Sequence, residues 1–468
     1  MPKLSNPSLP ASPPTDSAAR WKRIGKDLAG VILFAIVLAA VSWRLSRIML
    51  IPGKPQESHI AGRNGLADYR DVMYYPVRAV AEGINPYDCD TQTWLPNGSP
   101  RYRIRYPVYN IFPLYSPLIL LLYAPFTWFD FPTSALLYVS YNVGLLLALA
   151  YVAWRTIEVH PSIAAVTTLA AIMLATNAGR SNFLGGETAL PLGLATLAAA
   201  NYSRRNSVLS GLALAFTSFK PTIGLPLGIL LLCRRDVRSV ALGWGLGFVI
   251  AVTGLIIIFQ RSGDLARMPA ILRHNQQVVE SEPHVDPRFS TARLDAAGAI
   301  QRVVPGGQTM QLGASLIVLG IAGGSLWLLA GNESLAAREL SRTIICLGTV
   351  GSMYHTVYDG VLLWAPIVSL AYARSEYWRA APRWFRPALL TCLMIPMLNV
   401  LPTQTFVRAL QKLDITAANV PAPWPEIGWT LACTLTGFAV LAALVLLAWQ
   451  SWRLTSDERG AMRQLPVS

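Results

Sequence analysis

The residues best suited to chemistry begin in a hydrophilic stretch near the N-terminus. Asp68 and Asp71 are three residues apart in the sequence DYRDVMYY, so a helix would place both on one face. A carboxylate held in this way can act as a general base and take a proton from a hydroxyl group. Ordinary surface carboxylates on a solvated helix are the competing interpretation. The spacing leaves both interpretations open, and it leaves Asp71 as an alternative to Asp68.

A lysine interrupts the apolar sequence in the middle of the chain. Lys220 lies between the apolar stretches 208–219 and 222–233, and it precedes Pro221, which frees backbone hydrogen-bonding groups. A lysine at membrane depth must face a partner or a wet cavity. The competing interpretation is a lysine at the tip of a hairpin of short helices.

A third group lies where a late apolar segment begins. His355 and Asp359 are four residues apart, so a helix would bring them to one face, and Tyr358 is adjacent to Asp359. A histidine next to a carboxylate can bind a phosphate or sugar hydroxyls. A helix N-cap flanked by interfacial tyrosines is the alternative.

Two further stretches carry weaker candidates. Arg180, Asn182 and Glu187 flank a pair of glycines, which allow a ligand to approach the backbone closely. Arg103 and Arg105 belong to the alternating sequence RYRIRY, which suits binding to lipid headgroups or a carrier phosphate but equally suits solvated loop charge. No His or carboxylate spacing indicates a metal, and no phosphate-binding glycine motif indicates a nucleotide. We therefore expect no cofactor.

The composition shows what kind of scaffold positions these residues. Of 468 residues 53% are hydrophobic and only 14% are charged, against roughly 25% charged in a soluble domain. The net charge of +14 falls mostly in short stretches between apolar segments, which favours membrane topology and anionic lipids over nucleic acid. We predict an all-α polytopic membrane protein with about 11–13 transmembrane or half-membrane helices. The segments expected to form them are 28–50, 113–129, 135–154, 162–176, 188–200, 208–219, 222–233, 240–259, 312–330, 342–353, 361–373, 388–401 and 429–449.

Basic residues predict the orientation of this membrane domain, residues 27–452. The sequence WKRIGK precedes the first apolar segment, so residues 1–26 are expected to be a disordered basic tail in the cytoplasm. Later basic stretches fall on the same side, which makes the tail 453–468 cytoplasmic as well. The loops expected on the extracytoplasmic side are residues 52–112, 260–311 and 402–427.

Two local features refine this topology. Two short apolar segments lie between Arg155 and Arg204. Counting crossings places Arg155 outside and Arg204 inside, and two full crossings would return the chain to the same side. One of the two segments is therefore expected to cross only partly. In the first extracytoplasmic loop an apolar face formed by Tyr74, Val77 and Val80 predicts an amphipathic helix on the membrane interface. The sequence GINPYD is expected to end that helix.

The order of motifs along the chain resembles that of glycosyltransferase family 87. Glu187, after two glycines, stands where that family usually has a glutamine. The motifs that carry the resemblance are Asp68-Tyr69, Tyr74-Tyr75, GINPYD at 83–88, Tyr106-Pro107, the proline-flanked helix entry at 113–117, SFKP at 218–221 and YHTVYD at 354–359.

The resemblance implies a fold and a reaction. The fold is a GT-C-type membrane bundle, and the reaction moves a sugar, commonly mannose, from a polyprenyl-phosphate carrier to a hydroxyl acceptor with inversion. Asp68 would be the general base, with Asp71 as the alternate. Membrane lipids, the lipid-linked sugar and a glycolipid or glycan acceptor would be its partners, at the outer side of a bacterial-type plasma membrane. The residues expected to bind the donor are Lys220, His355, Tyr358, Asp359, Arg180, Asn182, Glu187, Arg103 and Arg105.

Two other functions use the same residues. In a transporter or flippase for a lipid-linked or anionic solute, Lys220, Glu187 and Asp359 would be intramembrane coupling groups. The carboxylate-rich first loop and the lack of an inverted repeat favour the transferase. A protein that binds the carrier without turnover is the third possibility.

Overall fold

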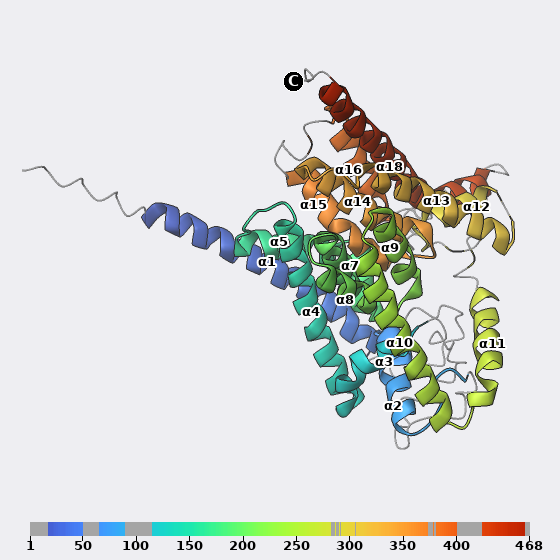
Figure 1. The fold of residues 1–468 in the computed structure, drawn as a ribbon. Coiled ribbons are helices and arrows are strands. Elements are labelled where there is room, and N and C mark those ends of the chain that lie inside the picture. Colours follow the sequence, from blue (N-terminus) through green and yellow to red (C-terminus); the bar gives the residue numbers. More distant parts are fainter. Residues whose placement is uncertain are drawn as a thin grey trace, which may run out of the picture.

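The computed structural model is an assembly of helices (Figure 1). In the described part of the chain, extended backbone pairs only in a single bridge between Arg293 and Thr356. The prediction of an all-α polytopic membrane protein is confirmed. The described residues are 17–49, 65–88, 115–281, 286, 290, 292–304, 306–372, 378, 381–399 and 424–463.

The helices follow the apolar segments of the sequence. In the first half of the chain they are α1 (Ser17–Met49), the π-helix η1 (Tyr69–Tyr74), α2 (Tyr75–Ala81), α3 (Leu118–Tyr123), the 3-10 helix η4 (Ala124–Trp128), α4 (Phe131–Arg155), α5 (Ile163–Ala175), α6 (Asn177–Gly185), α7 (Ala189–Tyr202), α8 (Ser207–Thr217) and α9 (Pro221–Cys233). In the second half they are α10 (Val237–Arg261), the 3-10 helix η5 (Leu265–Arg267), α11 (Met268–Ser281), α12 (Ala296–Val303), α13 (Gln308–Leu329), α14 (Leu335–Ser352), the 3-10 helix η6 (Val357–Leu363), α15 (Trp364–Tyr372), α16 (Phe385–Leu398) and α18 (Trp424–Arg463).

Five of the described helices contain segments long and apolar enough to cross a membrane. Each of these segments has 21 to 25 residues, which matches the roughly 20 residues that a helix needs to span the hydrocarbon core. Other apolar helices, such as α8 and α9, are too short to span alone. The full spans are Arg23–Arg47, Phe131–Arg155, Val237–Arg261, Thr309–Leu329 and Thr434–Asp457.

A bend between α5 and α6 lies in the stretch where one segment is expected to cross only partly. The two helices meet at 77°, so together they form a broken span or a re-entrant loop. Thr176 ends α5 in an extended conformation, and its hydroxyl accepts a hydrogen bond from the backbone N–H of Gly179 at 3.3 Å. A side chain on Gly179 would collide with the carbonyl oxygen of Met173, so the tight bend depends on glycine there.

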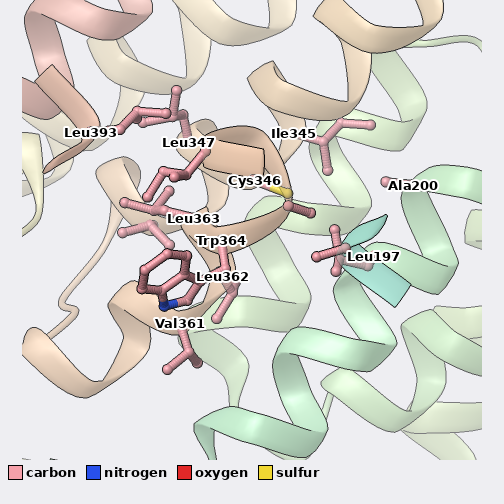
Figure 2. Close-up of a cluster of buried hydrophobic side chains, with 14 of the residues drawn as sticks. Leu197, Ala200, Ile345, Cys346, Leu347, Val361, Leu362, Leu363, Trp364 and Leu393 are labelled. Atoms are coloured by element: carbon pink, nitrogen blue, oxygen red, sulfur yellow. The ribbon is translucent and has the colours of Figure 1, made fainter. Parts of the chain in front are cut away.

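The main apolar core lies where α7, α9, α14 and η6 meet. Figure 2 shows Leu197 from α7, Ile345 from α14 and Leu362 from η6 among the buried side chains of this core. All three side chains are at most 1% exposed, so close van der Waals packing between the helices stabilises this core. Because η6 is packed on several sides, the polar residues at its start are held in fixed positions.

The amphipathic helix of the first loop is present as η1 followed by α2. Its apolar face does not lie free, because Val72, Tyr74 and Val77 are buried against the protein, where η1 and α2 contact α3 and η4. The expected interfacial helix is thus a packed element of the domain. This packing fixes the position of Asp68 at its start.

Candidate active site

Lys220 and Asp359 form a buried ion pair between two helix starts. Lys220 is the N-cap residue of α9, and Asp359 lies in the first turn of η6. The Lys220 Nζ donates to Oδ1 of Asp359 at 2.8 Å and to Oδ2 at 3.0 Å. Lys220 is 7% exposed and Asp359 is fully buried. The expectation that Lys220 faces a partner is confirmed.

His355 joins this pair from the loop before η6. Its Nδ1 lies 2.9 Å from Oδ2 of Asp359, and its Nε2 lies 3.1 Å from the backbone oxygen of Thr222. A carbonyl oxygen can only accept, so Nε2 carries a hydrogen. Residues 355 and 359 are in contact, but His355 precedes η6, so the two do not share a helical face. The alternative of a helix N-cap is also present, because Thr356 and Asp359 form the capping box of η6. The carboxylate of Asp359 thus lies between a lysine and a histidine.

The backbone around Glu187 is clamped against the segment that carries Asp68. The N–H of Leu66 donates to the carbonyl oxygen of Leu184 at 2.7 Å. Gly186 adopts a left-handed φ of 77°, and a Cβ there would lie 2.7 Å from the Cβ of Tyr69. Only glycine fits both the conformation and the close approach. The two glycines noted in the sequence therefore bring two backbone segments together.

The same clamp brings two carboxyl groups into contact. The side chains of Glu187 and Asp68 are close enough to form a hydrogen bond, and Lys220 and Asp359 are close enough to interact electrostatically with Glu187. Burial and the neighbouring Asp68 raise the pKa of Glu187 well above its usual range, against the opposing effect of Lys220. Four predicted residues from four parts of the chain thus meet in one cluster.

Tyrosines surround this cluster. The Lys220 Nζ lies 4.8 Å from the ring centre of Tyr358, which places a cation over an aromatic face. Tyr115 is buried and close enough to interact with the carboxyl groups of Asp68, Glu187 and Asp359. Sequence analysis identified Tyr358 but missed Tyr115, which it treated only as part of a helix entry.

A second buried ion pair supports His355 from the loop between α11 and α12. Arg293 donates to both carboxylate oxygens of Asp295, at 2.8 Å and 2.7 Å. Asp295 also accepts from the backbone N–H of His355 at 3.3 Å, and the N–H of Leu294 donates to the carbonyl oxygen of His355 at 3.0 Å. Sequence analysis missed both charged residues, because no spacing links them to a position some 60 residues away.

The weaker candidates have different positions. Asn182 is fully buried and donates to the backbone oxygens of Ala178 and Tyr358, so it links α6 to η6. Arg180 donates to Asn177 at 3.2 Å and lies near Arg44 of α1. Among the described residues, the contacts of Arg180 are thus with α6 and α1.

The remaining predicted residues are Asp71, Arg103 and Arg105. Asp71 falls within η1, three residues after Asp68. Arg103 and Arg105 lie outside the described residues.

The cluster combines a carboxylate able to accept a proton with a lysine that is held by Asp359 and keeps one N–H available for an anion. Both ring nitrogens of His355 are engaged with protein atoms. The model of glycosyltransferase family 87 matches residues 113–354, just over half of the chain. The chain belongs to glycosyltransferase family 87. Comparisons with curated proteins and with solved structures found no match.

The match locates part of the cluster within this glycosyltransferase. Glu187 and Lys220 fall inside the matched residues, whereas Asp68 lies before them and His355 and Asp359 follow directly after them. The family therefore establishes a membrane glycosyltransferase, and the contacts described above place these residues around one centre.

Proposed function

We propose that this glycosyltransferase moves a hexose, with mannose as the first candidate, from a polyprenyl-phosphate carrier to a hydroxyl acceptor. The observation that carries the proposal is the buried Lys220–Asp359 pair facing Asp68 and Glu187 beside short apolar helices. A donor with a lipid tail can reach such a site from within the membrane. Its phosphate then needs a cation at membrane depth, and Lys220 supplies one.

Asp68 acts as the general base in this proposal. The acceptor oxygen forms a bond to the anomeric carbon as the bond from that carbon to the phosphate oxygen breaks, and the phosphate takes the electron pair. The acceptor attacks from the side opposite the phosphate, so the configuration at the anomeric carbon inverts. Asp68 lies on that side in this proposal and receives the acceptor proton. Asp68 is only partly buried, which is compatible with access by a polar acceptor.

Lys220 stabilises the leaving phosphate. An ammonium group has three N–H donors, and the contacts with Asp359 account for two of them. Charge accumulates on the phosphate as the sugar departs, so a fixed cation stabilises the transition state more than the bound donor. His355 and Asp359 hold the lysine in place, and Tyr358 adjoins the same position.

The reaction is proposed at the extracytoplasmic face of a bacterial-type plasma membrane, with both termini in the cytoplasm. The distribution of basic residues supports this orientation. A glycolipid or glycan hydroxyl is the proposed acceptor, and membrane lipids are the other partners. No metal, cofactor or nucleic acid is part of the proposal.

A transfer assay with a lipid-linked donor tests this function. Purified full-length protein in proteoliposomes is given short-chain polyprenyl-phosphate-mannose labelled in the sugar, with glycolipid and polysaccharide acceptors in parallel. We expect labelled acceptor of inverted anomeric configuration, determined by NMR. A soluble nucleotide-linked mannose serves as the control donor and should give no product.

Two results would overturn the proposal. Transfer from the nucleotide-linked sugar without the lipid carrier would show that the donor class is wrong. Movement of the labelled lipid between leaflets, with no transfer to any acceptor, would favour a flippase.

A further inference from the structure

The Asp68–Glu187 contact is imposed by backbone packing. Tyr138 on α4 donates its hydroxyl to the backbone oxygens of Gly186 and Glu187, both at 2.9 Å. The ring of Tyr138 stacks on that of Tyr69, with ring centres 3.9 Å apart. Tyr69 directly follows Asp68, so one aromatic stack holds both carboxyl-bearing segments.

A hydrogen bond between two carboxyl groups requires a hydrogen on one of them. Ionised carboxylates can only accept, so the bond between Glu187 and Asp68 forms only when the pair holds a proton. Two carboxyl groups in such contact titrate together, and like charges at this distance disfavour the doubly ionised state.

The surroundings place that proton on Glu187. Glu187 is 9% exposed, whereas Asp68 is only partly buried. Burial disfavours the ionised form more strongly for the less accessible group. The cation that could stabilise an ionised Glu187 is Lys220, and it is held by both oxygens of Asp359.

The charged groups with the strongest influence on Glu187 are consistent with this assignment. Asp68 before η1 and Asp359 in η6 are acidic, and Lys220 at the start of α9 is basic. Phenols that also interact with Glu187 are Tyr115, Tyr138, Tyr354 and Tyr358. A neutral Glu187 also lowers the negative charge that an anionic donor would meet.

We propose that Glu187 is a protonated carboxylic acid at neutral pH and positions Asp68 by donating a hydrogen bond to it. Glu187 is thus a positioning residue that keeps the Asp68 carboxylate ionised and oriented toward the acceptor. The catalytic part of this inference rests on the proposed function, whereas the protonation state does not. Loss of the proton at alkaline pH would place two negative charges side by side and release Asp68.

Infrared spectroscopy tests the protonation state without a substrate. The full-length protein is labelled with ¹³C-carboxyl glutamate, and the C=O stretch of a protonated glutamic acid is followed with pH. We expect this band at neutral pH in the wild type and in Glu333→Gln, a control at an exposed ion pair far along the chain. The band should be absent in Glu187→Gln, and its presence there would overturn the assignment.

Stability against pH gives a second readout of the same proton. The pKa of Glu187 is raised in the folded state, so its contribution is fully present below the ordinary value of 4.5 and is lost as pH rises through the folded-state value. The wild type should therefore lose stability over that window, and Glu187→Gln should show a flatter profile. Identical profiles would contradict a protonated Glu187.

Kinetics test the positioning role. Glutamine retains an N–H donor, so Glu187→Gln should keep kcat close to wild type and lose the alkaline fall in activity. Glu187→Ala removes the donor and should lower kcat by about 10- to 100-fold, with unfolding followed to confirm that it is folded. Equal loss in Glu187→Gln and Glu187→Ala would show that Glu187 acts as a carboxylate and overturn the proposal.

The two proposals fail in distinguishable ways. A wild type that transfers no sugar overturns the proposed function, while the infrared band still decides the state of Glu187. A wild type that transfers sugar but lacks the band overturns the inference alone.

Discussion

The two ends of α9 each carry a basic side chain, and the two are held in different ways. Lys220 at the N-terminal end is paired with the carboxylate of Asp359, whereas Arg234 at the C-terminal end donates to the backbone oxygen of Ala200 at 2.9 Å. The helix dipole favours a cation at the C-terminus and disfavours one at the N-terminus. The helix dipole of α9 therefore stabilises the charge of Arg234 and destabilises that of Lys220.

Two arginines near Arg234 also donate to backbone oxygens. Arg342 donates to the backbone oxygen of Thr156 at 2.7 Å, and Arg204 donates to that of Ala330. These arginines satisfy carbonyl groups left open at helix ends. Arg342 and Arg204 also pair with Glu339 and Glu333. The difference at the other end of α9 is that both oxygens of the buried Asp359 bind the Lys220 ammonium group, and we assign the proposed chemistry to that end.

The largest expected effect is a loss of kcat on substitution of Asp68, the proposed base near the Lys220 end of α9. Asp68→Asn should lower kcat by about 10²- to 10⁴-fold, because the base is lost, while donor binding stays near the wild-type value. Transfer and donor binding are measured in parallel for Asp71→Asn. Loss of turnover confined to Asp71→Asn would show that Asp71, and not Asp68, is the general base, and the comparison of the two ends of α9 would still hold.

A smaller effect concerns the stability of the ion pair. Lys220→Met leaves Asp359 buried without its lysine and should lower the free energy of unfolding by about 3–5 kcal/mol. The double variant Lys220→Met/Asp359→Asn should recover part of that loss, because no unpaired charge remains. Chemical unfolding in detergent measures both, and strictly additive losses would argue against a coupled pair.

The smallest effect is expected at the other end of α9. Arg234→Met removes one hydrogen bond and a favourable dipole interaction, so it should cost about 1–2 kcal/mol of stability. Burial, reinforced by the neighbouring arginines, lowers the pKa of Arg234 to about 10, so some repulsion is relieved by the substitution. Activity per folded molecule should not change, and a specific loss of turnover would show that this end also takes part in the reaction.

Short-range patterns predicted a good part of this molecule. The apolar segments predicted most helices, and the spacing of four residues predicted the contact between His355 and Asp359. Membrane physics also predicted that Lys220 needs a partner. Each of these inferences depends either on residues close in sequence or on the cost of placing a charge in lipid.

Contacts between distant segments could not be predicted in this way. Lys220 and Asp359 are 139 positions apart, and Glu187 meets Asp68 only because α5 and α6 bend and Gly186 allows close packing. The bonds from Asn182 to the backbone oxygens of Ala178 and Tyr358 link α6 to η6, and no local pattern predicts them. An apolar face on a helix likewise does not reveal whether lipid or protein covers it.

The measurement that tests the account most directly compares the two ends of α9 in one assay. Sugar transfer from short-chain polyprenyl-phosphate-mannose is measured for Lys220→Met and Arg234→Met, each normalised to folded protein. We predict that Lys220→Met loses about 100-fold or more in turnover, as expected on removal of a group that stabilises transition-state charge, and that Arg234→Met matches the wild type. Equal turnover in the two variants would contradict the assignment of the reaction to the Lys220 end.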